Sequence, residues 1–241
     1  MVDMEHLQAL LNCATESDWQ EVFFSLCRGQ GFDLALFAVV PSRHVALESA
    51  FVHSSYAPRW RATYDTEKLH YVDPTVEHCL ARNVPVVWSP SIFRSSCQKR
   101  LYEEASAYGI RSGITFPIHG PRGEFGVLSL ATGNLGSRDF ISEFGHTLPD
   151  LALIRDYVFE SCLRFAPGGR SAERTVHLTP RERECLQWSM EGKSSWEIAR
   201  ILCCSEATVN FHVANIRRKF DVTTRRQAVV KAIRLGLISV G

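Results

Sequence analysis

Helix-capping signals recur at short intervals through residues 178–222 and constrain the fold of this stretch more than any other feature of the sequence. Thr179 is followed by Pro180 and then by Glu182, which is the order of an N-cap, a first helical residue and the glutamate of a capping box. Gly192 ends the same helix. The residues that open two further helices are Ser194 with Glu197 in a second capping box, and Ser205. The spacing therefore predicts three short amphipathic helices joined by tight turns.

The third of these helices has two different faces. Apolar residues recur at helical spacing along one face, at Val209, His212 or Val213, Ile216 and Phe220. The opposite face carries Asn210, Ala214, Arg217 and Arg218, with Phe211 at its edge. A buried stripe and a polar, cationic stripe on the second of two closely joined helices are typical of a helix-turn-helix. The alternative is an ordinary helical bundle whose polar side chains are solvated.

The exposed stripe has the chemistry of a DNA-reading surface. Asn210 offers a bidentate amide that fits adenine, and Arg217, Arg218 and Lys219 can neutralise phosphates or reach guanine. The pattern L-T-x-R-E-x-E-x-L-x-W, G-K-S-x-x-E-I-A and S-E-x-T-V-x-F-H-x-x-N-I-x-x-K-F closely resembles the DNA-binding domain of LuxR-type transcription regulators. The resemblance implies contacts with double-stranded DNA from Lys193, Ser194, Thr208, Asn210, Phe211, Ala214, Arg217 and Arg218.

A last helix is expected after a further capping box of Thr224 and Gln227, running to about Leu235 with Gly236 as its stop. The resemblance implies that its apolar face docks and dimerises. The charge distribution fits the same interpretation: residues 170–241 carry 13 basic and 7 acidic side chains, a net charge of +6, whereas the remaining residues carry 14 and 19, a net charge of −5. Only the C-terminal part has the positive charge that DNA attracts.

The eight cysteines show no C-x-x-C pair and no Cys/His spacing typical of zinc, so no metal site is expected. Several lie on predicted apolar helix faces, which favours buried, reduced thiols. The sequence shows no signal peptide and no apolar run as long as a membrane span, so we expect a cytoplasmic protein without a membrane partner.

The N-terminal part mixes helices and strands. Helices are expected at about 4–13, 17–28 (opened by a Ser17/Gln20 capping box), from Pro58, 74–82 (capped by Asp73), 98–108 and 139–165, with Pro149 as a break or a new first turn. Strands are expected at 32–40, 45–53, 84–88, 111–118 and 124–131. The fold class is therefore α+β, an N-terminal α-β-α sandwich with an antiparallel sheet followed by an all-α domain. The expected domains are 1–165, a linker at 166–174, and 175–241.

One group of residues in the N-terminal part is unusual for a plain core. Tyr56, Trp60 and Tyr64 are four residues apart and share one helix face. Such a stripe is more often core than ligand site, and Asp73 alone is most simply a helix cap. The pattern W-x-x-x-Y, V-D-P, W-S, G-I-T-F-P and L-S-L, however, resembles the autoinducer-binding domain of the LuxR family. The family's ligand is an N-acyl-homoserine lactone, and no other cofactor is implied.

The parts of such a lactone explain the residue types. The resemblance implies that Trp60 donates to the lactone carbonyl, ionised Asp73 accepts from the amide N–H, and Tyr56 and Ser129 bond the amide carbonyl. Arg61 would reach a 3-oxo group through water. The full set of implied ligand-binding residues is Tyr56, Trp60, Arg61, Tyr64, Asp73, Thr75, Trp88, Thr115, Ser129, Leu36, Val76, Ile110 and Val127. A medium or long acyl chain is expected, but its length stays open because Phe125 and Val127 are bulkier than the residues often found there.

The leading hypothesis is a ligand-activated homodimeric transcription factor that binds a pseudo-palindromic site and engages RNA polymerase as an activator. Two alternatives stay open. The first is a regulator of the same fold that binds and responds to a different small molecule. An esterase or lactonase is disfavoured because the sequence has no G-x-S-x-G motif and no clustered His/Asp ligands.

Overall fold

The computed structural model describes residues 2–133, 140–166, 177–235 and 237–238. The chain divides into two compact units, Met1–Ser171 (the N-terminal unit) and Ala172–Gly241 (the C-terminal unit). Apart from Ala166, the predicted linker at 166–174 lies outside the described residues, as does the predicted helix stop at Gly236. Each unit has its own hydrophobic core.

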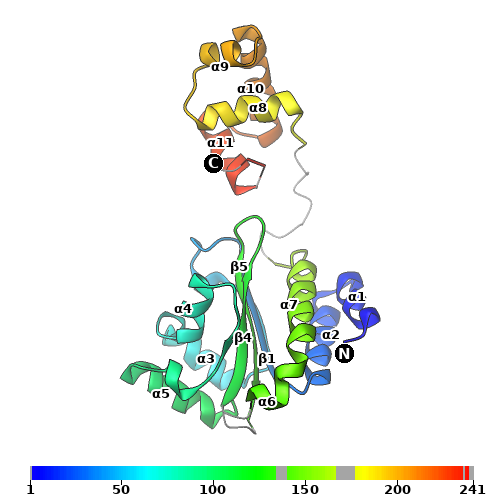
Figure 1. Cartoon of the computed structure of the whole chain (residues 1–241), viewed down its shortest axis with the longest axis vertical. Helices are drawn as coiled ribbons and strands as arrows, with labels where there is room; N and C mark the ends of the chain where they lie inside the picture. The colour runs from blue at the N-terminus through cyan, green and yellow to red at the C-terminus, as the bar shows by residue number, and fades with distance from the viewer. Residues whose placement is uncertain (1, 134–139, 167–176, 236, 239–241) are drawn as a thin grey trace. The chain divides into compact units, whose positions relative to one another are not determined.

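The N-terminal unit is built on a five-stranded sheet in the order β2-β1-β5-β4-β3. The strands are β1 (Leu34–Val40), β2 (Phe51–Ser54), β3 (Val86–Val87), β4 (Ser112–His119) and β5 (Phe125–Thr132), and every neighbouring pair is antiparallel. β5 is buried at every position and β4 at all but its last, because helices cover both faces of the sheet. The predicted α+β sandwich with an antiparallel sheet is confirmed (Figure 1).

One face of the sheet carries the main hydrophobic core. It is covered by α1 (Met4–Asn12), α2 (Glu16–Gly29) and α7 (Leu148–Cys162), with α6 (Phe140–Phe144) and the 3₁₀ turn η4 (Gly145–Thr147) leading into α7 (Figure 1). Pro149 falls in the first turn of α7, as expected from the sequence. Aromatic side chains from both layers fill the space between them: Trp19, Phe23, Phe37, Phe116 and Phe140.

The other face is covered by α3 (Pro58–Thr66), α4 (Pro74–Ala81) and α5 (Ser96–Ala107) (Figure 1). Three 3₁₀ turns connect these elements: η1 (Leu47–Ser49), η2 (Leu69–Tyr71) and η3 (Pro90–Ile92). The side chains on this face form a second cluster that includes Trp60, Trp88, Phe93 and Leu101. This layer surrounds the cavity described below.

Three predicted boundaries in this unit are wrong. The strand expected at 45–53 is shorter, because η1 occupies 47–49 and β2 begins at Phe51. The capping box expected at Ser17 and Gln20 does not form: Thr15 caps α2, and Gln20 Oε1 lies 2.6 Å from Nδ1 of His53. α5 begins at Ser96 rather than 98, since Ser95 and Gln98 make its capping box.

The C-terminal unit contains α8 (Pro180–Met190), α9 (Ser195–Ile201), α10 (Glu206–Phe220) and α11 (Arg225–Arg234). The capping boxes predicted at Thr179, Ser194 and Thr224 are all present, and Ser205 caps α10. Apolar side chains from the four helices pack together in one core, among them Leu186, Ile198, Val209, Ile216, Phe220 and Ala228. The four predicted helices are therefore confirmed.

Candidate functional site

A cavity of about 640 Å³ lies between the sheet and the layer of α3, α4 and α5. Nearly all of the predicted ligand-binding residues line it: Leu36, Tyr56, Trp60, Arg61, Tyr64, Asp73, Thr75, Val76, Trp88, Ile110, Val127 and Ser129. Its size falls within the range of small-molecule sites, which is roughly 300–1,000 Å³. Thr115, which was also predicted to bind the ligand, is not among the lining residues.

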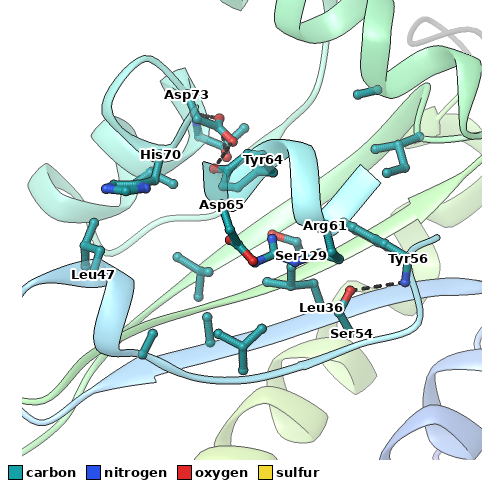
Figure 2. A pocket seen from close by; sticks show the side chains of 18 of the residues that line it. Leu36, Leu47, Ser54, Tyr56, Arg61, Tyr64, Asp65, His70, Asp73 and Ser129 are labelled. Atoms are coloured by element: carbon teal, nitrogen blue, oxygen red, sulfur yellow. Dashed lines mark hydrogen bonds and ion pairs between the residues drawn. The ribbon is translucent and has the colours of Figure 1, made fainter. Parts of the chain in front are cut away.

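Asp73 is the most strongly hydrogen-bonded acidic group of the cavity wall. Its Oδ1 accepts from the Thr75 amide at 2.8 Å and from the Thr75 hydroxyl at 2.7 Å, while its Oδ2 accepts from the Tyr64 hydroxyl at 2.9 Å (Figure 2). Burial raises the pKa of Asp73, and the bonds from Thr75 and Tyr64 oppose the rise. The backbone amide of Val76 also lowers the pKa of Asp73, so several donors hold this carboxylate in place as an acceptor.

The Tyr56 hydroxyl is buried in the cavity wall and has no hydrogen-bond partner within the described part of the chain. Burial and the nearby charge of Asp73 raise the pKa of Tyr56 far above its ordinary value, so the hydroxyl stays protonated. An unpaired buried hydroxyl is unfavourable by roughly 1–3 kcal/mol. Tyr56 is therefore ready to bond a polar atom inside the cavity.

The structure corrects the expected placement of Tyr56. It precedes the first residue of α3, Pro58, so it does not share a helix face with Trp60 and Tyr64. Its backbone amide donates to Ser54 Oγ at 3.1 Å, which fixes the turn from β2 into α3 (Figure 2). Trp60 itself is held by an edge contact with Tyr64 at 6.0 Å between ring centroids.

A chain of hydrogen bonds stands behind the cavity wall. Trp88 Nε1–H donates to Thr115 Oγ1 at 2.9 Å, and Thr115 Oγ1 lies 3.0 Å from Ser129 Oγ. Thr115 is 0% exposed, so it holds Trp88 and Ser129 in place and does not reach the cavity. β4 needs glycine at 113 here, since an added Cβ would lie 2.8 Å from the Trp88 ring.

The exposed face of α10 carries the residues predicted to contact DNA. Asn210, Phe211, Ala214, Arg217 and Arg218 are all exposed on α10, as are Thr208 near its start and Ser194 at the N-cap of α9; Lys193 is half-buried. Phe211 exposes 62% of its surface, which is high for an aromatic side chain. On the opposite face Val209, Ile216 and Phe220 are buried, while His212 and Val213 are both half-buried. The two predicted stripes are confirmed.

Lys219 is exposed, but its ammonium is already bonded within the C-terminal unit. Its ammonium donates to Glu182 Oε2 at 2.6 Å and to the His177 carbonyl at 2.8 Å. Glu182 is 3% exposed; burial raises its pKa, but Lys219 and the Thr179 amide outweigh this and leave the pKa below its usual value. Lys219 therefore joins the end of α10 to the start of α8, and its phosphate contact stays a prediction.

Two family models match the chain. The autoinducer binding domain matches residues 15–162, the part that encloses the cavity. The domain described as bacterial regulatory proteins, luxR family, matches residues 176–232, the part that carries the helix-turn-helix. The chain is a member of the LuxR family.

The similarity to other LuxR-family proteins extends over nearly the whole chain. The transcriptional activator VanR of Vibrio anguillarum is 32% identical over 225 residues, which are 93% of this chain and 92% of VanR. The quorum-sensing regulator RhlR of Pseudomonas aeruginosa is 36% identical over 225 residues, 92% of this chain and 91% of RhlR. A crystal structure of Escherichia coli SdiA has the same fold, with a TM-score of 0.71, 24% identity and coverage of 98% and 97%.

Membership of the LuxR family makes this chain a transcription regulator and not an enzyme. All eight cysteines lie among the described residues, and all are free thiols. Within the described residues, no helix has the length and hydrophobicity of a membrane span, and no cluster of three His, Cys, Asp or Glu side chains could hold a metal ion.

Sequence reasoning missed several residues of this LuxR-family cavity. Leu47, Glu48 and His70 line it from the 3₁₀ turns η1 and η2, and Tyr102 lines it from α5. Because neither turn has the periodicity of a helix or a strand, no pattern in the sequence indicates which side chains turn inward. Four apolar residues of regular elements also line the cavity: Ala38, Leu101, Ala105 and Phe125.

Proposed function

We propose that the cavity binds an N-acyl-homoserine lactone and that the liganded protein activates transcription as a homodimer. The observation that carries this proposal is the pairing of the Asp73 carboxylate with an unpartnered Tyr56 hydroxyl in one largely apolar cavity. The amide of the ligand offers an N–H to the first and a carbonyl to the second. No purely apolar ligand would satisfy either group.

The head group is bound by residues around Asp73. Trp60 Nε1–H donates to the lactone carbonyl, Asp73 accepts from the amide N–H, and Tyr56 and Ser129 bond the amide carbonyl. Tyr64 and Thr75 hold Asp73 in place through the bonds described above. Thr115 acts only through Trp88 and Ser129.

The acyl chain lies along the apolar wall formed by Leu36, Val76, Ile110 and Val127. A cavity of about 640 Å³ supports a medium or long chain. Arg61 lines the cavity beside Tyr64 and bonds Asp65 at 2.5 Å, which supports a role in binding an oxygen at the 3-position of the acyl chain through water.

DNA binding uses the exposed face of α10 together with the start of α9. Two copies of the chain present paired recognition helices to a pseudo-palindromic site in double-stranded DNA, where Asn210, Arg217 and Arg218 contact bases and phosphates. The remaining contacts come from Lys193, Ser194, Thr208, Phe211 and Ala214. The relatives VanR and RhlR, a transcriptional activator and a quorum-sensing regulator, support activation, which requires RNA polymerase as a partner in the cytoplasm.

The test is to express the full chain with a panel of acyl-homoserine lactones, purify it and identify the extracted ligand by mass spectrometry. We expect one lactone to be retained, and Tyr56→Phe to weaken its binding about tenfold through loss of one hydrogen bond. Tyr157→Phe removes the same hydroxyl from α7, on the other side of the sheet, and serves as the matched control. Recovery of a different acyl compound, such as the octanoyl glycerol of an SdiA complex, with no lactone retained, would contradict the proposal.

A further inference from the structure

His70 presents an unsatisfied nitrogen at the cavity. It lies in η2, lines the cavity, and its side chain is only 10% exposed. Its Nε2 is buried without a hydrogen-bond partner in the described part of the chain. The facing acidic atom, Glu48 Oε1, is 3.7 Å away, which is longer than a hydrogen bond. Some other polar atom is needed to satisfy this imidazole.

Glu48 is also held loosely. Its Oε1 lies 3.4 Å from the Lys68 ammonium and 3.4 Å from the Tyr71 hydroxyl, whereas strong bonds to a carboxylate measure roughly 2.7–2.9 Å. Glu48 lines the same cavity as His70. An imidazole and a carboxylate therefore approach one part of the cavity, each with unused bonding capacity and too far apart to satisfy each other.

His70 lies away from Tyr56, one of the two groups assigned to the amide carbonyl. In Figure 2, His70 and Leu47 are at one end of the pocket and Tyr56 is at the other. The wall next to the pair is apolar, since Leu47, Ala50 and Val76 also line the cavity. A ligand whose head group reaches Tyr56 therefore passes its acyl chain by His70 and Glu48.

We infer that the natural ligand carries a hydroxyl group on its acyl chain, bonded by His70 and Glu48. This inference rests on the proposed lactone function. A hydroxyl has one O–H and two lone pairs, so it accepts from the protonated Nε2 of His70 while it donates to Glu48. A keto oxygen cannot donate to the carboxylate, and a methylene bonds neither group. The cavity thus favours a hydroxylated chain over an oxo or an unsubstituted one of equal length.

A competition experiment tests the inference. The full chain is expressed with an equimolar mixture of acyl-homoserine lactones of equal chain length: unsubstituted, 3-oxo, 3-hydroxy and chain-terminal hydroxy. The lactones extracted from the purified protein are then quantified. We expect one hydroxy compound to exceed the unsubstituted compound by about tenfold or more, the ratio given by one hydrogen bond of ordinary strength.

Two variants identify the residues responsible. His70→Leu removes the imidazole and should bring the ratio down to one or below, whereas Tyr157→Phe, on α7 at the other face of the sheet and outside the cavity lining, leaves it unchanged. A wild-type protein that retains the unsubstituted lactone equally well overturns the inference, even if His70→Leu fails to fold, and leaves the lactone function intact. If no lactone of any kind is retained, the proposed function itself fails.

Discussion

Removing the ligand should destabilise the N-terminal unit by a large part of its folding free energy. Empty apolar cavities are unfavourable by about 24 cal/mol per Å³, so the full cavity of about 640 Å³ would correspond to about 15 kcal/mol. The polar groups of the wall admit water, which makes this an upper bound. A quarter of it, about 4 kcal/mol, is still a large share of the roughly 5–15 kcal/mol that stabilises a typical domain. The unpaired hydroxyl of Tyr56 adds to the penalty.

Calorimetry and hydrogen exchange with and without a cognate lactone measure this effect. A ligand at 100 times its dissociation constant stabilises the folded state by about 2.7 kcal/mol, which raises the midpoint of a domain of this size by about 5–10 °C. Soluble yield should rise in parallel. New exchange protection should concentrate between about 32 and 131, with the helices of the C-terminal unit unchanged. Equal midpoints, yields and exchange patterns at saturating lactone would refute the reasoning.

Four further outcomes are expected. Asp73→Asn should abolish lactone binding measured on folded protein, because the amide is a weaker acceptor and presents its own donors. The lactone affinity of the wild-type protein should fall as the pH is lowered, since burial raises the pKa of Asp73 and the ligand bonds the ionised form. Lys219→Ala should lower the melting midpoint of the C-terminal unit by the equivalent of about 1–3 kcal/mol, because the buried Glu182 loses its cation. The isolated fragment 175–241 should fold and bind DNA only weakly, measured by fluorescence anisotropy, because it lacks most of the proposed dimer interface.

Each of these outcomes has a control. Unchanged lactone affinity in Asp73→Asn would contradict the site, and a wild-type affinity that does not change as pH is lowered would contradict the role of this carboxylate. Because the pKa of Glu182 is lowered, the stability from its bond with Lys219 is present above the unfolded-state pKa and is lost as the pH falls below it. A wild-type melting midpoint that does not change as the pH is lowered would argue against this ion pair. A fragment that binds one operator as tightly as the liganded full chain would exclude the two-domain dimer.

The helices of the C-terminal unit could be predicted from the sequence because the capping signals that define them are local. A capping box joins a side chain to a backbone amide three residues away, so Thr179, Ser194 and Thr224 place their helices correctly without tertiary information. The bond between Lys219 and Glu182 was not predicted, for the opposite reason. Glu182 lies 37 residues before Lys219, and nothing in the spacing of α10 indicates that this cation is already bonded.

The cavity was predictable only where it is lined by regular elements. The sequence pattern identified Asp73 and Trp60, but not that Thr115 lies behind the wall, since this depends on the strand register that places it opposite Ser129. His70 was missed because its 3₁₀ turn follows Lys68, which adopts a left-handed conformation that is rare for lysine and leaves no recognisable pattern.

The bond from Lys219 to the His177 carbonyl has a consequence for the engineering of chimeric regulators. The backbone just before α8 holds the end of α10 in place. The structural start of the C-terminal unit therefore lies upstream of its first helix. A fusion that transplants this unit onto another sensor domain should therefore keep His177 and the residues after it. A junction placed at Pro180 would remove both the Thr179 cap and the carbonyl that anchors the end of α10.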